Sequence, residues 1–135
     1  WGIILFFVGL FIVLEGVNVS GILSDIMNMF NNYGLPLSTP LWYVTFVTIL
    51  SNLVSNVPAV LLLSPITYQT KFWLALALSS TLAGNATIIG AAANIIVLEI
   101  ANTYGMDINW IRFSRVGIPV TVITIALGTL ILFLI

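Results

Sequence analysis

Two short polar segments interrupt otherwise apolar stretches of this chain, at residues 51–58 and 83–94. The first holds two serines, two asparagines and a proline, and the second holds glycines, asparagines and a threonine. In the hydrocarbon core of a membrane an unpaired amide is strongly unfavourable, so polar, helix-breaking segments persist there mainly where they line a cavity or bind a ligand. We therefore expect these two segments to carry the function of the chain.

The composition is that of an integral membrane protein. Hydrophobic residues make up 61% of the 135 residues and charged residues 5%, whereas soluble domains carry about 25% charged residues. The net charge of −1 offers no basic patch for nucleic acid and no polybasic segment for lipid headgroups. The lack of cysteine and histidine removes thiol nucleophiles, thiolate metal sites and the usual general base. We therefore expect neither an enzyme nor a nucleic-acid partner, and a lipid bilayer as the surroundings.

Segment lengths predict an all-α membrane protein with three spans in one domain, residues 1–135. Residues 1–19 have about the length of a spanning helix, and residues 116–135 form an apolar closing span. Residues 71–100 are longer than a straight span needs, and we predict one helix broken near its middle. Residues 20–40 have apolar residues at helical spacing on a polar stretch, which predicts an interfacial helix and a loop.

The first predicted span carries glycines at regular spacing. Gly2, Gly9 and Gly16 are each seven residues apart, which returns them to within about 20° of the same helix face. Small residues on one face let another helix approach closely. The pattern therefore predicts a helix-packing groove rather than a ligand site.

Residues 41–66 allow two interpretations. The apolar stretch from Leu41 to Leu63 has the length of one straight span. Pro58 follows the central polar cluster, removes a backbone donor and clashes with the preceding turn. Because of this polar cluster and Pro58, we favour a re-entrant hairpin with its tip at residues 51–57. Each arm would then be too short to cross the bilayer, as expected for a re-entrant loop.

Charged residues predict the orientation of the chain. If residues 41–66 re-enter, residues 101–115 form a loop on the opposite side of the membrane from the hairpin loops. Arg112 and Arg115 lie in this loop, and only Lys71 lies on the other side. The excess of basic residues places residues 101–115 in the cytoplasm and the carboxyl terminus outside a multi-pass cell membrane protein.

The polar residues of the two segments are candidate ligands of one ion and substrate site. Asn85 and Asn94 would lie on opposite faces of an unbroken helix, and a break between them removes this conflict. A break also exposes carbonyl oxygens, which suit Na⁺, and a helix amino terminus, which attracts an anion. The candidate residues are Ser51, Asn52, Ser55, Asn56, Val57, Gly84, Asn85, Thr87, Gly90 and Asn94.

We divide the roles within this candidate site by chemistry. Asn56 and the carbonyls around it would contact the coupling cation, whereas Asn85, Thr87 and the second half-helix amino terminus would hold the substrate. An alternative is that the polar residues at 51–56 only form a ladder of hydrogen bonds to neighbouring helices.

Four parts of the chain resemble a known superfamily. The string Ser-Asn-Val-Pro at residues 55–58 is similar to the Ser-Asn-Thr or Asn-x-Pro signature of the ion transporter superfamily. This superfamily includes divalent-anion/sodium symporters, citrate transporters, arsenite permeases and NhaD-type antiporters. Residues 82–94 resemble the unwound helix that follows the hairpin in those proteins, and residues 6–11 and 115–119 resemble flanking helices of the arsenite-permease branch.

The resemblance implies the second of two inverted repeats, with the amino-terminal repeat of the same protein outside this chain. The chain is thus expected to be a piece of a longer protein, and the resemblance implies a homodimer. It also implies a secondary active transporter that moves a small inorganic or organic anion of the arsenite or citrate type.

Coupling would be to Na⁺ or H⁺, with Ser55 and Asn56 as Na⁺ ligands and no other cofactor. Val57 stands where sodium-coupled dicarboxylate symporters have threonine, which favours the arsenite-type branch. Two alternatives stay open. One is a Na⁺/H⁺ antiporter of the same superfamily, and the other is a membrane scaffold subunit that does not transport.

Overall fold

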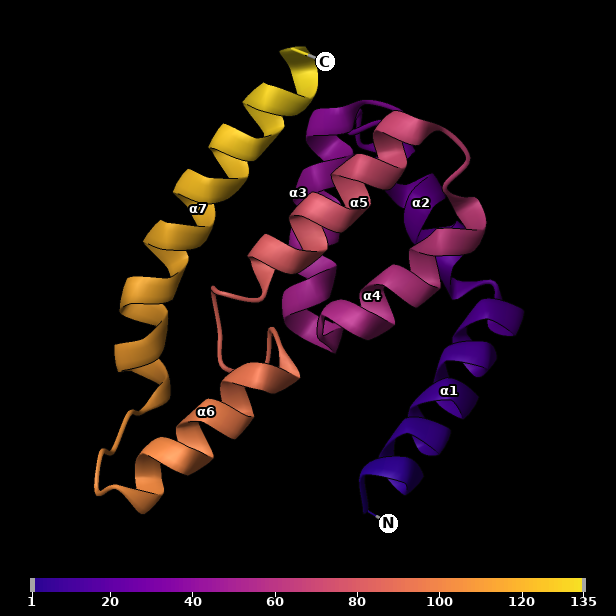
Figure 1. Cartoon of the computed structure of the whole chain (residues 1–135). Coiled ribbons are helices and arrows are strands. Elements are labelled where there is room, and N and C mark those ends of the chain that lie inside the picture. Colours follow the sequence, from indigo (N-terminus) through magenta and orange to yellow (C-terminus); the bar gives the residue numbers. More distant parts are fainter. Residues whose placement is uncertain (1, 135) are drawn as a thin grey trace.

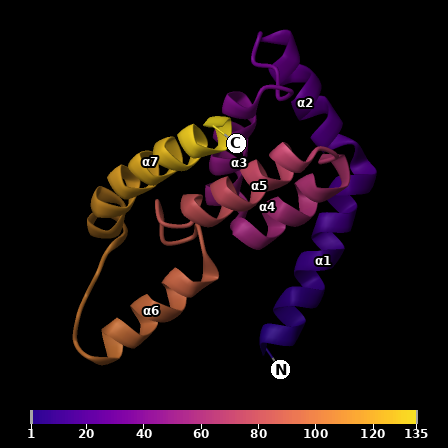
Figure 2. The same ribbon diagram turned by 45° about the horizontal axis from the view of Figure 1, so that its top comes forward.

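The computed structural model describes residues 2–134, except for the side chains of residues 2, 3, 6 and 7. The regular elements in this part of the chain are helices, with no strand among them. The helices are α1 (Gly2–Ser20), α2 (Ile22–Asn32), α3 (Pro40–Val54), α4 (Asn56–Leu63), the 3-10 helix η1 (Ser64–Ile66), α5 (Thr70–Ala83), α6 (Ala92–Thr103) and α7 (Trp110–Leu134). The predicted all-α fold is confirmed. Helices α3, α4 and α5 form a central group, with α1 and α7 on opposite flanks in both views (Figures 1 and 2).

Helices α3 and α5 pack closely because each buries a stripe of small or β-branched side chains. The stripes are Val44, Val47 and Ser51 on α3 and Ala75, Ser79 and Ala83 on α5. Residues spaced three or four apart lie on one helix face, and small side chains let two backbones approach. The hydroxyl of Ser51 donates to the carbonyl of Ser80 at 3.2 Å across this interface. This interface fixes the position of the polar end of α3 against the end of α5.

Aromatic side chains hold the other end of the central group. Phe30 of α2 packs edge-to-face on Phe46 of α3, with ring centroids 5.1 Å apart. Tyr43 packs in the same manner on Phe72 of α5 at 4.9 Å. Edge-to-face pairs favour a defined ring geometry. The aromatic contacts therefore attach α2 and the start of α5 to the first half of α3.

Few helices in residues 2–134 are long enough to cross a membrane. By length and composition, only Trp110–Leu134 qualifies alone, and Val8–Ser20 with Ile22–Asn32 would add one span if this pair, bent by 56°, acted together. The sequence predicts three spans. The count is lower for two reasons. The span that the sequence predicts to be broken consists of two shorter helices, α5 and α6, and the first predicted span is counted only together with α2.

The closing helix begins earlier than predicted. The backbone N–H of Arg112 donates to the side chain of Asn109 at 2.9 Å, which is the hydrogen bond of a helix N-cap. Helix α7 therefore begins at Trp110 instead of residue 116, and Arg112 and Arg115 lie in its first turns. The prediction of a loop over residues 101–115 is wrong in extent, because only residues 104–109 connect the two helices.

The glycine face of α1 has no close neighbour. A Cβ atom placed at Gly9 or Gly16 would have nothing within 4 Å. The helix contact predicted from these glycines is not formed within residues 2–134.

Candidate functional site

The first helix interruption is a single residue. Helix α3 ends at Val54 and α4 begins at Asn56, and Ser55 between them has φ 75° and ψ 160°. This backbone region is almost restricted to glycine, so serine is strained there. Among the residues described it is the one non-glycine residue with positive φ. The chain turns back at this point, so that α3 and α4 form a helical hairpin (Figure 1).

The second interruption is longer and is held by side chains. Residues 84–91 are not helical, whereas the sequence predicts a break over residues 83–87. The side-chain amide of Asn94, in the first turn of α6, donates to the carbonyls of Gly84 at 2.6 Å and of Thr87 at 3.0 Å. The N–H of Gly90 donates to the Thr87 hydroxyl at 3.1 Å. These bonds satisfy peptide groups that a broken helix leaves without partners.

Asn52, in the last turn of α3 before the first interruption, joins this helix to the second interruption. Its amide nitrogen donates to the carbonyl of Ala83, the last residue of α5, and to the carbonyl of Thr48, both at 3.0 Å. Its amide oxygen accepts a hydrogen bond from the Thr87 hydroxyl at 3.0 Å. The hairpin and the broken helix are therefore in direct contact through one side chain.

Glycines allow this close approach. A Cβ at Gly90 would lie 3.0 Å from the Asn52 amide oxygen and 3.0 Å from the Gly84 carbonyl oxygen. A Cβ at Gly117 of α7 would collide with the carbonyl oxygen of Asn85. Any larger residue at either position would push the second interruption away from its neighbours. The closing helix is thus seated directly against residues 85 and 86.

The structure brings only part of the predicted site together. Asn52, Gly84, Thr87, Gly90 and Asn94 meet where α3 contacts the second interruption. Ser51 lies beside them in the chain and bonds to Ser80, within α5. Asn85 is exposed, and its side chain forms no hydrogen bond among the residues described. Ser55, Asn56 and Val57 lie at the hairpin tip, on the other side of Asn52 in the chain.

A separate cavity lies beside the hairpin tip. Its volume is about 220 Å³, and Asn56 and Val57 of α4 and Ser80 and Thr81 of α5 line it. Ser80 and Thr81 are polar residues that the sequence reasoning missed. The signal that could have found them is their place on α5, less than one turn before the Ala83-Gly84 break.

The hydrogen bonds divide the asparagines into two groups. Both amide hydrogens of Asn52 and both of Asn94 are taken by backbone carbonyls. The Asn56 oxygen accepts from the next N–H, at 2.9 Å, and its NH₂ forms no hydrogen bond within residues 2–134. Asn52 and Asn94 therefore hold these segments together, whereas the NH₂ group of Asn56 and the side chain of Asn85 have no partner within residues 2–134. Within residues 2–134 no group of three or more His, Cys, Asp or Glu could hold a metal ion.

Comparisons with known proteins agree with the membrane character of the fold. The model of the citrate transporter family, CitMHS, matches residues 1–71, which include the first interruption. The 46 kDa membrane protein of Mycobacterium leprae (strain TN) is 33% identical over 147 residues, covering 99% of this chain and 34% of the relative. The silicon efflux transporter LSI3 of Oryza sativa subsp. japonica is 35% identical over 151 residues, covering 95% of this chain and 30% of the relative. No solved structure matches the chain.

The relatives are much longer than this chain. It spans about a third of the length of the curated relatives it matches, 34% in the first three, so the function of a whole protein involves further residues. The family match covers more than half of the 135 residues, and the relatives align over nearly all of them. The chain therefore belongs to the citrate transporter family, within the ion transporter superfamily that its motifs resemble.

Proposed function

We propose that the full-length protein is a secondary active transporter that moves a small anion or oxyanion coupled to Na⁺ or H⁺. The observation that carries this proposal is the contact of the last turn of α3, directly before the first interruption, with the second interruption through Asn52, which bonds to Ala83 and Thr87. Irregular backbone at membrane depth is tolerated where it is buried in protein or lines a cavity, and in transporters such breaks form the substrate and ion sites. Membership of the citrate transporter family supports the proposal.

The lengths of the helices support a re-entrant hairpin. Helix α3 has 15 residues and α4 has 8, so at about 1.5 Å per residue α3 is about 22 Å long, shorter than the ~30 Å hydrocarbon core. Helices α5 and α6 have 14 and 12 residues and would cross the membrane only together. We infer that α3 and α4 enter and leave on one side and that α5 and α6 form one broken span.

The remaining arrangement in the membrane is proposed from charge. Arg112 and Arg115 lie at the beginning of α7, and their positive charges would hold residues 104–109 at the cytoplasmic side, with the carboxyl terminus outside. The other inverted repeat would come from the rest of the full-length protein, which would assemble as a homodimer.

The free polar groups suggest a division of labour. Asn56 and Ser55 with the carbonyls of the hairpin tip offer neutral oxygens, which suit Na⁺. Asn85 and the amino terminus of α6 offer N–H donors and a favourable dipole for an anion. Thr87 would donate to the anion only by giving up its bond to Asn52, because its one hydroxyl hydrogen is used there. Asn52 and Asn94 would position these groups and would not donate hydrogen bonds to the ligand, because their amide hydrogens are already used.

The test is transport by purified full-length protein in proteoliposomes. Uptake of a panel of anions, including citrate and arsenite, is measured with and without a Na⁺ or pH gradient. We expect Asn56→Ala and Asn85→Ala each to lower uptake by at least about tenfold, the effect of one lost ligand contact. Their thermal unfolding should stay close to that of the parent protein, because neither NH₂ group bonds within the fold described and Asn56→Ala loses only the hydrogen bond from the neighbouring Val57 N–H.

Asn28→Ala is the matched control, because Asn28 is exposed on α2 and lines none of the cavities described here. It should transport at the parental rate. Parental uptake by both Asn56→Ala and Asn85→Ala would remove the proposed site. Impaired assembly of these variants, with no ion-dependent flux in the parent protein, would favour a scaffold subunit. Exchange of Na⁺ for H⁺ without any anion would identify an antiporter.

A further inference from the structure

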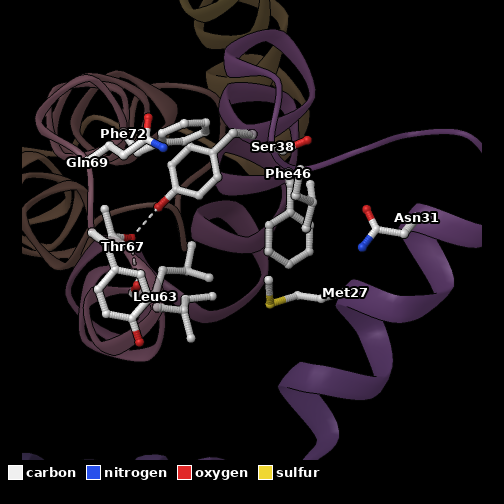
Figure 3. Close-up of a pocket in the computed structure, with 12 residues that line it drawn as sticks. Met27, Asn31, Ser38, Phe46, Leu63, Thr67, Gln69 and Phe72 are labelled. Carbon is white, nitrogen blue, oxygen red and sulfur yellow. Dashed lines mark hydrogen bonds between the residues drawn. The ribbon is translucent and has the colours of Figure 1, made fainter.

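A second cavity lies at the end of the central group away from the helix interruptions. Its volume is about 320 Å³, and its walls come from α2, α3, η1 and the residues leading into α5. Figure 3 shows Met27 and Asn31 on one side, facing Thr67 and Gln69 on the other. Tyr43, which lines it, precedes Ser55 by twelve residues along the hairpin arm, which corresponds to about 18 Å of helix. It is thus separate from the proposed transport site.

Tyr43 and Thr67 form the polar floor of this cavity, and the directions of their hydrogen bonds can be assigned. The Thr67 hydroxyl donates to the carbonyl of Leu63 at 2.7 Å. A hydroxyl has one hydrogen, so the 2.7 Å bond between Tyr43 and Thr67, the dashed line in Figure 3, must have the Tyr43 hydroxyl as its donor. The Tyr43 oxygen then offers a lone pair and no hydrogen. The Tyr43 oxygen can therefore accept a hydrogen bond from a ligand. It cannot donate one unless the hydrogen bonds from Tyr43 to Thr67 and from Thr67 to Leu63 rearrange.

The walls favour an uncharged ligand. Phe46 and Phe72 supply apolar aromatic surface, and Asn31 and Gln69 supply neutral amides. None of the residues that line the cavity is charged. A bound ion would lose water without gaining a countercharge, which is strongly unfavourable. The volume lies within the range of about 300–1,000 Å³ that is typical of small-molecule sites.

We propose that this cavity binds an uncharged small molecule that has an aromatic or aliphatic body and a hydroxyl group. The body packs between Phe46 and Phe72, and the hydroxyl donates a hydrogen bond to the Tyr43 oxygen. The proposal does not depend on the transport function, because no residue of the cavity belongs to the site proposed for it.

The test uses two fluorinated probes that differ by one hydroxyl group. The full-length protein in detergent micelles is titrated with 4-fluorobenzyl alcohol and, separately, with 4-fluorotoluene, and binding is followed by fluorine NMR. We expect saturable binding of the alcohol. Tyr43→Phe keeps the ring and removes the oxygen, so it should weaken binding of the alcohol about fivefold, the effect of one hydrogen bond, and leave 4-fluorotoluene unchanged.

A matched pair of variants locates the site. Asn31 lines the cavity, and Asn28, one turn earlier on α2, does not, although both are exposed. Asn31→Trp should block saturable binding of the alcohol, and Asn28→Trp should leave it unchanged. The proposal is overturned if the alcohol only partitions without saturation, if Tyr43→Phe affects both probes equally, or if Asn31→Trp binds the alcohol as the parent protein does.

Discussion

The two helix interruptions differ in how they are stabilised. The first is one residue long and turns the chain through an unfavourable backbone conformation at Ser55. The second is eight residues long, 84–91, and its freed peptide groups are satisfied by the side chains of Asn52 and Asn94. The first interruption thus depends on local backbone strain, whereas the second depends on tertiary contacts. Substitutions should therefore affect the two in opposite ways.

The largest effect is expected where α7 meets the second interruption. Gly117→Ala would place a methyl group against the carbonyl oxygens of Asn85 and Ala86. We expect the free energy of unfolding to fall by about 3 kcal/mol, at the upper end of overpacking effects because both obstacles are backbone atoms. Thermal unfolding of the full-length protein in detergent measures this.

Gly16→Ala on α1 provides the control for that substitution. Nothing lies within 4 Å of the added methyl group, and alanine is favoured over glycine in a helix by about 1 kcal/mol. This variant should be as stable as the parent protein or more so. If Gly117→Ala and Gly16→Ala unfolded at the same temperature, α7 would not be seated against the second interruption.

A smaller loss is expected when the contact of Asn52 between α3 and the second interruption is removed. Asn52→Ala frees the carbonyl of Ala83 and the hydroxyl of Thr87. Because Asn52 is half-buried, we expect a loss of about 2 kcal/mol, within the range for unsatisfied polar groups, together with loss of uptake. Asn28→Ala should show neither change. A stable Asn52→Ala variant with parental uptake would mean that this contact is not needed.

The smallest effect, of opposite sign, is expected at the first interruption. Ser55→Gly removes the side chain from a backbone conformation that glycine adopts freely, so stability should rise by about 1 kcal/mol. Uptake should fall, because the proposed ion ligand is lost. Ser64→Gly, at φ −56° and ψ −41°, is the control and should lower stability. Lower stability in both variants would contradict the strain at Ser55.

Much of the fold follows from the residues themselves. The near absence of charge predicts a membrane protein, and Pro58 and the Gly84-Asn85 pair coincide with the regions where helices end. The predicted extent of the loop at residues 101–115 fails because the sequence reasoning overlooked the Asn109 cap. The predicted break at residues 83–87 is too short, because helix α6 does not begin until Ala92. The side chain of Asn94 donates to the carbonyls of Gly84 and Thr87, which holds the intervening residues out of a helix.

The candidate site was harder to predict than the fold. Asn52, Asn56, Asn85 and Asn94 have the same side chain, and nothing local separates their roles. Only the contacts between distant segments show that two of them have both amide hydrogens occupied. Whether the other two contact an ion and a substrate stays a prediction.

The residues alone indicate a membrane protein in which two polar segments end helices, because hydrophobicity and backbone-breaking residues act locally. The bond of Asn52 to Thr87, 35 residues away, and the contact of Gly117 in another helix with the same segment are visible only once the helices are packed together. Such bonds depend on how whole helices pack, and the packing of helices is set by stripes of small residues whose partners no single segment reveals.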